Sequence, residues 1–396
     1  MRALSYRRPS GGHWIVAEGQ HVACGDVLAA GPVPLHAARS GRISALSGDI
    51  ARLESSGEPT EPWAPLASSD PSLVMARIRD AGIVGLGGGG YPTHAKLVAA
   101  KRRGASKLLI NAVECEAGIS CDAALCQQDL VTIERGVRVL ARLLDAEAHV
   151  VTSSPTRAAG HIDGVIHHAY EAVSTPAGAE RVLCKRLFDL TLRADEYPVD
   201  HGVVVVNLGT AHAIARAIAG WPLIERMVSI GDDNQWLAIG TPVADLLPGT
   251  TCREGGLLSG RPLAPPFAVS KVTNALHPAP QLAEQPCIRC GACDEACPAE
   301  LPVTELVAAT GDLASLQRLR ADECIECGLC NPVCPSDIAV LDRLRAARQA
   351  VTLARRQADA AQSAQARYHI HQARADAQAA AKAQRRAERL RRLNRG

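Results

Sequence analysis

The sequence of 396 residues is poor in aromatic side chains, with two Phe, five Tyr and four Trp. No apolar run approaches the ~20 residues that a membrane-spanning helix needs. The first ten residues also lack the apolar stretch of a secretory signal peptide. These absences predict a soluble or peripheral protein in a reducing compartment. A chain of this length has room for about two to four domains.

Cysteine is abundant by contrast, and eight of the 14 cysteines form one pattern that occurs twice. Residues 287–298 and 324–335 both read C-x2-C-x2-C-x3-C-P. In bacterial ferredoxins, three cysteines of one such run and the fourth of the other run bind each 4Fe–4S cluster. Zinc sites use C-x2-C pairs without the third cysteine and the C-P, and disulfides would need an oxidising compartment. The sequence therefore predicts two 4Fe–4S clusters.

The crossed pattern assigns four ligands to each cluster. The first set is Cys287, Cys290, Cys293 and Cys334, and the second is Cys324, Cys327, Cys330 and Cys297. A protein that holds two such clusters transfers electrons.

Positive charge is concentrated at the end of the chain. Residues 342–396 contain 13 Arg and one Lys against three Asp and one Glu, a net charge of +10, and the total of +2 leaves about −8 for the rest. This Ala-, Gln- and Arg-rich tail predicts a solvated helix or a disordered segment. It suits an acidic partner or anionic lipid headgroups. We do not expect nucleic-acid binding, because no stacking aromatics or binding motif accompany the charge.

A glycine-rich segment, residues 85–96 (GLGGGGYPTHAK), lies between two stretches of helical periodicity. Consecutive glycines let the backbone approach an anion and present successive N–H groups to it. The helix that starts after Pro92 adds its positive end, and Lys96 follows one turn later. The segment therefore predicts a phosphate site, and a mobile glycine loop is the alternative.

Strands and helices alternate after the glycine segment. We expect strands over 107–113, 148–152 and 202–207, and helices over 122–145, 156–172 and 208–219. This alternation favours an α/β domain with parallel strands. Glu114 and Glu116 follow the first strand at its carboxyl end, where open α/β sheets bind ligands. A solvated acidic loop is the alternative for these two residues.

In this order, the glycine segment, the Asn111-Ala-x-Glu114-x-Glu116 stretch and the doubled cysteine run resemble the C subunit of the Rnf/Rsx ion-translocating electron transport complex. The resemblance implies a multidomain α/β protein. Its expected parts are a barrel-sandwich (lipoyl-like) β module over 1–60, a Rossmann-like FMN- and NADH-binding α/β domain over 61–225, a small SLBB-like β domain over 226–279, a two-cluster 4Fe–4S ferredoxin-like α-helical domain over 280–341, and the basic tail over 342–396.

The resemblance also implies a flavin site without a catalytic nucleophile or base. Gly85, Gly87, Gly88, Gly90 and Lys96 would bind the FMN phosphate and ribityl chain, Asn111 and Glu114 would contact the flavin, Asn207 and Thr210 would close the site, and Tyr91 and Glu116 would face NADH.

The implied function is electron entry into a membrane complex. FMN would exchange electrons with NADH and with the two clusters, while partner subunits in the membrane move ions and the complex exchanges electrons with a ferredoxin or similar carrier. The chain would then lie peripherally on the cytoplasmic side of the cell membrane. Two alternatives stay open, namely a soluble flavin/iron–sulfur reductase of the cobalamin reductase kind and a non-enzymatic cluster relay.

One departure from the relatives motivates the relay alternative. Relatives carry a Tyr-Pro-x-Gly-Gly-Glu-Lys motif, whereas here Tyr197-Pro198 leads through Gly202 directly into the buried strand. On this interpretation, the glutamate and lysine of the motif are absent and the NADH site is incomplete.

Overall fold

A computed structural model describes residues 3–55, 63–114, 116–170, 176–193, 196–263, 267–279 and 283–393. Part of the expected linker between the first two domains, residues 56–62, lies outside the described residues. The chain divides into two compact units. The first unit is Met1–Ala283 together with Cys327–Pro332, and the second is Glu284–Glu326 together with Val333–Gly396.

The first unit begins with two small antiparallel sheets, where the sequence predicts short strands and turns. One sheet has the order β1 (Ala3–Arg7), β7 (Ile50–Ser55), β6 (Gly41–Ser47) and β3 (His21–Val22). The other has the order β2 (His13–Trp14), β4 (Val27–Ala30) and β5 (Leu35–His36). Leu28, Ile43 and Leu53 are fully buried, so the two sheets have an apolar interior.

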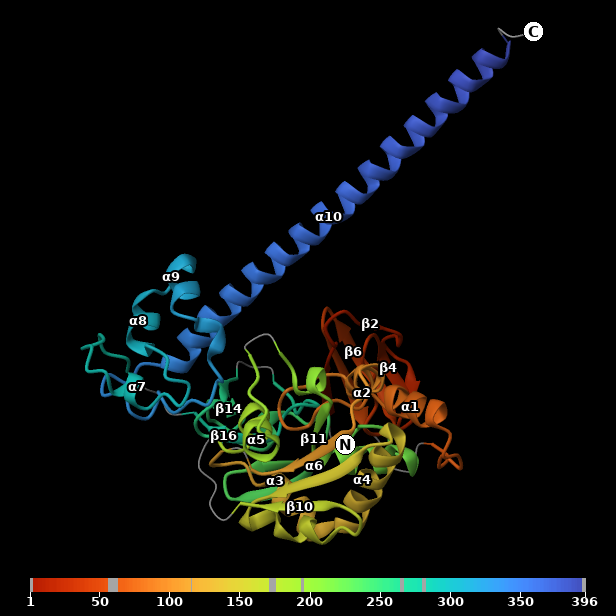
Figure 1. The fold of residues 1–396 in the computed structure, drawn as a ribbon. Coiled ribbons are helices and arrows are strands. Elements are labelled where there is room, and N and C mark those ends of the chain that lie inside the picture. The colour runs from red at the N-terminus through yellow and green to blue at the C-terminus, as the bar shows by residue number, and fades with distance from the viewer. Residues whose placement is uncertain are drawn as a thin grey trace. The chain divides into compact units, whose positions relative to one another are not determined.

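A parallel sheet forms the centre of the first unit (Figure 1). Its order is β10 (Ile166–Ala169), β9 (Glu147–Thr152), β8 (Lys107–Ala112) and β11 (Val203–Asn207). Leu108 and Ile110 belong to one core cluster with residues of α4 and α6, whereas Leu109 belongs to another with residues of α5. Both faces of the sheet are therefore covered, which explains the continuous apolar strands.

The helices of this α/β domain match most of the predicted segments. They are α1 (Pro71–Asp80), α2 (Thr93–Arg102), α3 (Cys121–Gln128), α4 (Leu130–Leu144), η1 (Ser154–His161), α5 (Glu180–Phe188), η2 (Pro198–His201) and α6 (Leu208–Ile218). The helix predicted over 122–145 is divided at Asp129, whose side chain accepts a hydrogen bond from Thr132 N and starts α4. The helix predicted over 156–172 is wrong. There a short 3-10 helix is followed by a turn at Gly164 (φ +75°) and by β10, which pairs with β9.

A five-stranded sheet follows the α/β domain. Its order is β13 (Asp233–Ala238), β12 (Glu225–Ile230), β16 (Ala275–Pro278), β14 (Cys252–Glu254) and β15 (Arg261–Pro262), with the short helix η3 (Val243–Asp245) between β13 and β14. Val228, Leu237 and Leu276 form its own apolar cluster. Only the pairing of β12 with β16 is parallel.

The second unit is helical. It contains α7 (Ala292–Glu295), α8 (Val303–Ala308), α9 (Leu313–Arg318), η4 (Ala321–Glu323) and α10 (Val340–Leu393). Figure 1 shows α10 as one unbroken helix of 54 residues. Its first turns bury Leu344 and Val351, whereas the described side chains from Arg355 onward are exposed. Among the described residues, no helix is long and apolar enough to cross a membrane.

Candidate functional site

A cavity of about 330 Å³ lies at the carboxyl ends of β8 and β11. These strands are neighbours in the sheet although β9 and β10 come between them in the chain, so the chain changes direction here. Asn111 and Asn207, which lie at the ends of the two strands, are register partners. Open α/β sheets bind ligands at such a switch point, and the volume lies within the range of small-molecule sites.

Most of the predicted flavin residues lie around this cavity. Those that line it are Gly85, Gly87, Tyr91, Lys96, Asn111, Glu114, Asn207 and Thr210. Gly88 and Gly90 belong to the same glycine loop but are not among the described lining residues, and neither is Glu116. Tyr91 is 59% exposed, which places it at the mouth of the cavity.

The glycine loop is closed on itself and held from behind. Gly85 N donates to Tyr91 O (2.9 Å), and Gly90 N donates to Gly85 O (3.1 Å). Leu86 is bound through both backbone groups, because its N–H donates to Thr210 Oγ1 (2.9 Å) and its carbonyl accepts from Arg226 Nη2 (2.9 Å). A position such as Gly88, with φ +96°, favours glycine. The loop is therefore a fixed wall rather than the mobile loop that the sequence left as an alternative.

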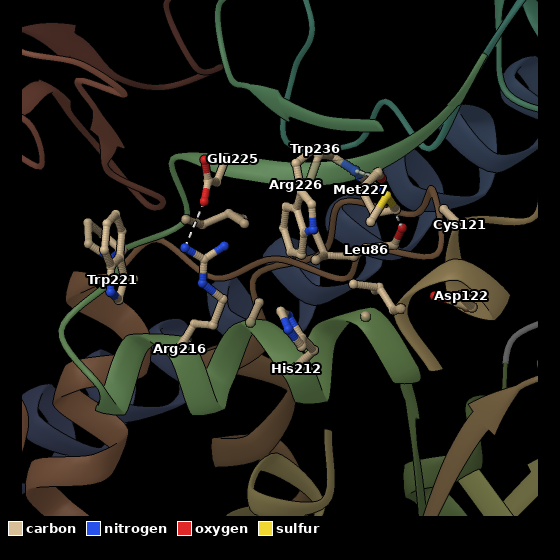
Figure 2. A pocket seen from close by; sticks show the side chains of 15 residues that line it. Leu86, Cys121, Asp122, His212, Arg216, Trp221, Glu225, Arg226, Met227 and Trp236 are labelled. Atoms are coloured by element: carbon tan, nitrogen blue, oxygen red, sulfur yellow. Dashed lines mark hydrogen bonds and ion pairs between the residues drawn. The ribbon is translucent and has the colours of Figure 1, made fainter. Parts of the chain in front are cut away.

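The side chains behind the loop surround a second, much smaller cavity between α6 and β12 (Figure 2). Its volume of about 20 Å³ holds roughly one water. Arg216 pairs with Glu225 (2.7 Å), and its guanidinium lies 5.1 Å from the ring centres of Trp221 and Trp236. His212 Nε2 lies 3.0 Å from Asp129 Oδ2. These charges are satisfied within the protein, so this region supports the glycine loop.

Two buried carboxyl groups lie at the floor of the larger cavity. Glu114 Oε1 accepts from Ala123 N (2.9 Å), and Asp122 Oδ2 accepts from Asn207 Nδ2 (2.6 Å). Burial raises the pKa of Asp122 to about 6. Burial and the nearby Asp122 carboxylate raise the pKa of Glu114 well above its usual range. Sequence reasoning missed Asp122, although an acid at the start of a predicted helix eight residues after Glu114 was a usable signal.

The carboxyl pair predicts how stability depends on pH. Folding raises the pKa of Asp122 from 3.8 to about 6 and raises that of Glu114 as well, so the folded chain binds protons more tightly than the unfolded chain. The stabilisation is fully present below the unfolded pKa and is lost as pH rises through the folded pKa. We expect the free energy of unfolding to fall by on the order of 1–3 kcal/mol from about pH 4 to above pH 6.

Chemical unfolding of the wild type and Asp122→Asn over this pH range measures the effect. The Asn variant keeps one acceptor oxygen for the Asn207 amide and should lose much of the pH dependence. Parallel stability curves for the two proteins would show that the carboxyl pair has ordinary pKa values.

A second wall comes from the segment that starts α5. Gly178, Ala179 and Glu180 line the cavity, and Gly178 O accepts from Asn111 Nδ2 (2.9 Å). Gly178-Ala-Glu-Arg181 has the small residues, acid and base of the Gly-Gly-Glu-Lys motif that the sequence interpretation assigned to Tyr197–Gly202. Tyr197 is instead 64% exposed at the start of η2. The signal that could have found this segment was an acid followed by a base after two small residues.

Lys96 Nζ forms an ion pair with Glu180 Oε1 (2.9 Å), and both side chains are partly exposed. An anion bound at the glycine loop would have to compete with Glu180 for the lysine. We therefore expect Glu180→Gln to strengthen FMN phosphate binding and Lys96→Ala to weaken it. The change for Glu180→Gln should be about two- to fivefold in Kd, since an exposed ion pair contributes up to about 1 kcal/mol.

Titration of the FMN-free chain with FMN, followed by quenching of flavin fluorescence, tests the exchange. Riboflavin, which lacks the phosphate, is the matched ligand control. An equal effect of Glu180→Gln on both ligands would show that Lys96 does not act on the phosphate.

In the second unit, another cavity is lined by Cys287, Cys290, Cys293 and Cys334. This is the first ligand set that the crossed pattern predicts, with three cysteines from one run and the fourth from the other. Thr304 Oγ1 lies 3.4 Å from Cys293 Sγ and donates to Asp294 Oδ2 (2.7 Å), which fixes the turn next to the cavity. For the second set, Cys327 and Cys330 belong to the first compact unit and Cys297 and Cys324 to the other, so their shared cluster stays a prediction.

Residues 78–216 match the family model of the Nuo51 FMN-binding domain, and residues 286–339 match the 4Fe–4S dicluster domain. The chain is 32% identical over 349 residues to the C subunit of the ion-translocating oxidoreductase complex of Edwardsiella ictaluri, covering 73% of this chain and 42% of that protein. For the protein of the same name in Serratia proteamaculans, the identity is 34% over 340 residues, covering 73% and 48%. The chain is a homologue of these C subunits.

The chain spans about half the length of the curated relatives it matches. Among solved structures, a chain of an NAD+-reducing [NiFe]-hydrogenase in the H2-reduced state shares the fold, with a TM-score of 0.51 and 17% identity, covering 70% of this chain and 60% of that one. The first family match contains all the predicted flavin residues, and the second contains all eight cysteines. The expected mixed α/β organisation with an FMN-binding domain and a 4Fe–4S dicluster domain is therefore confirmed.

Proposed function

We propose that this chain is the electron-entry subunit of an Rnf-type ion-translocating complex and passes electrons between NADH, FMN and two 4Fe–4S clusters. The observation that carries this proposal is the cavity at the β8–β11 switch point. It joins the glycine loop, both strand-end asparagines and Glu114 within the segment that matches an FMN-binding domain. The same chain also contains the dicluster domain, so a flavin site and two cluster sites occur together.

The residues around the cavity suit FMN. The glycine loop and Lys96 would bind the phosphate and ribityl chain, with Gly85, Gly87, Gly88 and Gly90 supplying close backbone approach. Asn111, Glu114, Asn207 and Thr210 would fix the orientation of the flavin ring. Tyr91, at the exposed mouth, would contact NADH. When bound, FMN supplies a carrier that takes two electrons from a hydride donor and releases them singly to one-electron clusters.

The remaining parts of the proposal concern assembly. The two N-terminal sheets suit a barrel-sandwich module over 1–60, and the five-stranded sheet suits an SLBB-like domain over 226–279. Their proposed neighbours are the flavin domain over 61–225, the cluster domain over 280–341 and the tail over 342–396. The name of the relatives supports membrane-embedded partner subunits that move ions and a ferredoxin-type carrier. The exposed basic part of α10 supports a peripheral position at an anionic cytoplasmic membrane surface.

Anaerobic titration with NADH tests the proposal on the full chain after iron–sulfur reconstitution and FMN loading. We expect both flavin and cluster absorbance to bleach as NADH is added. Cluster absorbance that stays unchanged while dithionite still reduces the clusters would overturn the electron-entry role and leave the non-enzymatic relay.

A further inference from the structure

Glu116 is buried and 8% exposed, and its carboxylate binds a distant loop rather than the cavity. Glu116 Oε1 accepts from Leu258 N (2.8 Å) and from Ser259 N (2.9 Å). Glu116 Oε2 accepts from the Ser259 hydroxyl. Two further contacts fasten the neighbouring backbone, because Leu257 N donates to Ala117 O (3.0 Å) and His277 Nε2 lies 2.8 Å from Gly118 O.

The loop of residues 256–260 leaves no freedom for this arrangement to slide. A Cβ at Gly256 would overlap the carboxylate of Glu116, so only glycine lets the loop approach this closely. A buried carboxylate that accepts three hydrogen bonds holds its partners strongly, since charge-assisted hydrogen bonds are about twice as strong as neutral ones. Glu116 therefore fixes where the Leu258–Ser259 peptide lies.

The opposite side of the same peptide contacts the turn that carries two cluster cysteines. The segment Cys327–Pro332 belongs to the first compact unit together with this loop. A Cβ at Gly328 would lie 2.5 Å from the Leu258 carbonyl carbon and 3.0 Å from Ser259 N. Asn331 Nδ2 also donates to Leu258 O (3.4 Å). One peptide group is thus held by Glu116 at its N–H and by the cysteine turn at its carbonyl.

These contacts form a short path through the first unit. Glu114 lines the cavity, Glu116 follows two residues later, and the Leu258–Ser259 peptide joins Glu116 to the turn that contains Cys327 and Cys330. We propose that Glu116 is a positioning residue for electron transfer, which holds this loop against the cysteine turn so that the cluster on Cys327 and Cys330 exchanges electrons directly with the flavin.

This inference rests on the proposed function and gives Glu116 a role other than the NADH contact that the resemblance implies. Each transfer moves one electron from the reduced flavin to one oxidised cluster and makes or breaks no bond in the protein. Because tunnelling falls steeply with separation, releasing the loop from Glu116 should slow the transfer without removing either cofactor. An NADH-binding role would instead change the KM for NADH and leave flavin-to-cluster transfer alone.

The test uses the full reconstituted, FMN-loaded chain and a reductant that needs no nucleotide. Light reduces the bound FMN with EDTA as the sacrificial amine donor, and the bleaching of cluster absorbance is then timed. We expect Glu116→Ala to slow this step by about tenfold or more, as is typical when a supporting hydrogen bond to a metal centre is lost. Glu116→Gln keeps an acceptor oxygen for both N–H groups and should restore most of the rate.

Iron and FMN contents of each variant separate this effect from a failure to assemble. If the wild type itself transfers no electrons from flavin to cluster, the proposed function fails. If the wild type transfers and Glu116→Ala with full cofactor content is equally fast, only the inference about Glu116 is overturned. A raised KM for NADH with an unchanged light-driven rate would establish the NADH contact instead.

A pair of glycine variants tests the other side of the peptide. Gly328 (φ +76°) and Gly291 (φ +79°) occupy the same position in the two cysteine runs, so an alanine introduces the same backbone strain at each. A Cβ at Gly328 would press on the Leu258 peptide, whereas one at Gly291 has Asp294 Oδ2 at 3.9 Å as its nearest neighbour. We expect Gly328→Ala to slow the light-driven step several-fold more than Gly291→Ala. Equal slowing by both variants would contradict the contact.

Discussion

Cys334→Ala is expected to remove the cluster of the first cysteine run, although Cys334 belongs to the second. The reason is that Cys287, Cys290, Cys293 and Cys334 line one cavity. A cubane that loses one of four thiolate ligands is poorly held, so the variant should keep about half of the bound iron of the wild type. Iron and sulfide analysis after anaerobic reconstitution measures the loss.

Double variants identify the lost cluster without any spectroscopic assignment. Cys287→Ala combined with Cys334→Ala should lose no more iron than either single variant, because both residues bind the same cluster. Cys324→Ala combined with Cys334→Ala should lose both clusters. Cys297→Ala is the reciprocal case and should behave like Cys324→Ala. If Cys334→Ala and Cys324→Ala together lose only half of the iron, each run binds its own cluster and the crossed ligation is wrong.

Arg226→Met is expected to destabilise the first unit and to weaken FMN binding together. The Arg226 side chain is buried and donates to Leu86 O (2.9 Å) behind the glycine loop and to Lys271 O (2.6 Å). Removing the guanidinium leaves both carbonyls without this donor and takes a cation away from the buried Asp122 carboxyl. Loss of one partner from such a buried group costs about 3–5 kcal/mol.

Arg216→Met is the matched control, since Arg216 lines the same small cavity but does not contact the loop (Figure 2). Its partner Glu225 keeps Arg39 at 4.0 Å, so the cost should be nearer ~1 kcal/mol. Chemical unfolding and FMN titration of the two variants give the comparison. Equal FMN affinity in both would show that the glycine loop does not depend on Arg226.

The parts of the site that the sequence predicts are those fixed by local spacing. Three cysteines of a run lie on one tight turn, and the glycines of residues 85–90 lie on one loop, whatever the rest of the chain does. Strands such as Val203–Asn207 were also predictable, because a run of buried β-branched residues indicates a covered parallel strand.

What the sequence does not predict depends on residues far apart in the chain. Glu116 looks like a second ligand-facing acid, and only the fold brings Leu258 and Ser259 to it, more than 140 positions later. Glu180 reaches the cavity because α5 begins there, a placement that no local pattern of its segment reports. The helix predicted over 156–172 failed because alanine and histidine show no strong shared preference, so pairing with β9 decided the strand.

The central claim is that electrons reach the clusters through a flavin held at the β8–β11 switch point. Its most direct test is rapid mixing of NADH with the reconstituted chain, prepared with and without FMN, while flavin and cluster absorbance are followed together. The account predicts that flavin bleaches first, that cluster bleaching follows, and that the FMN-free chain shows no cluster reduction on this timescale. Cluster reduction by NADH at the same rate in the FMN-free chain would contradict it.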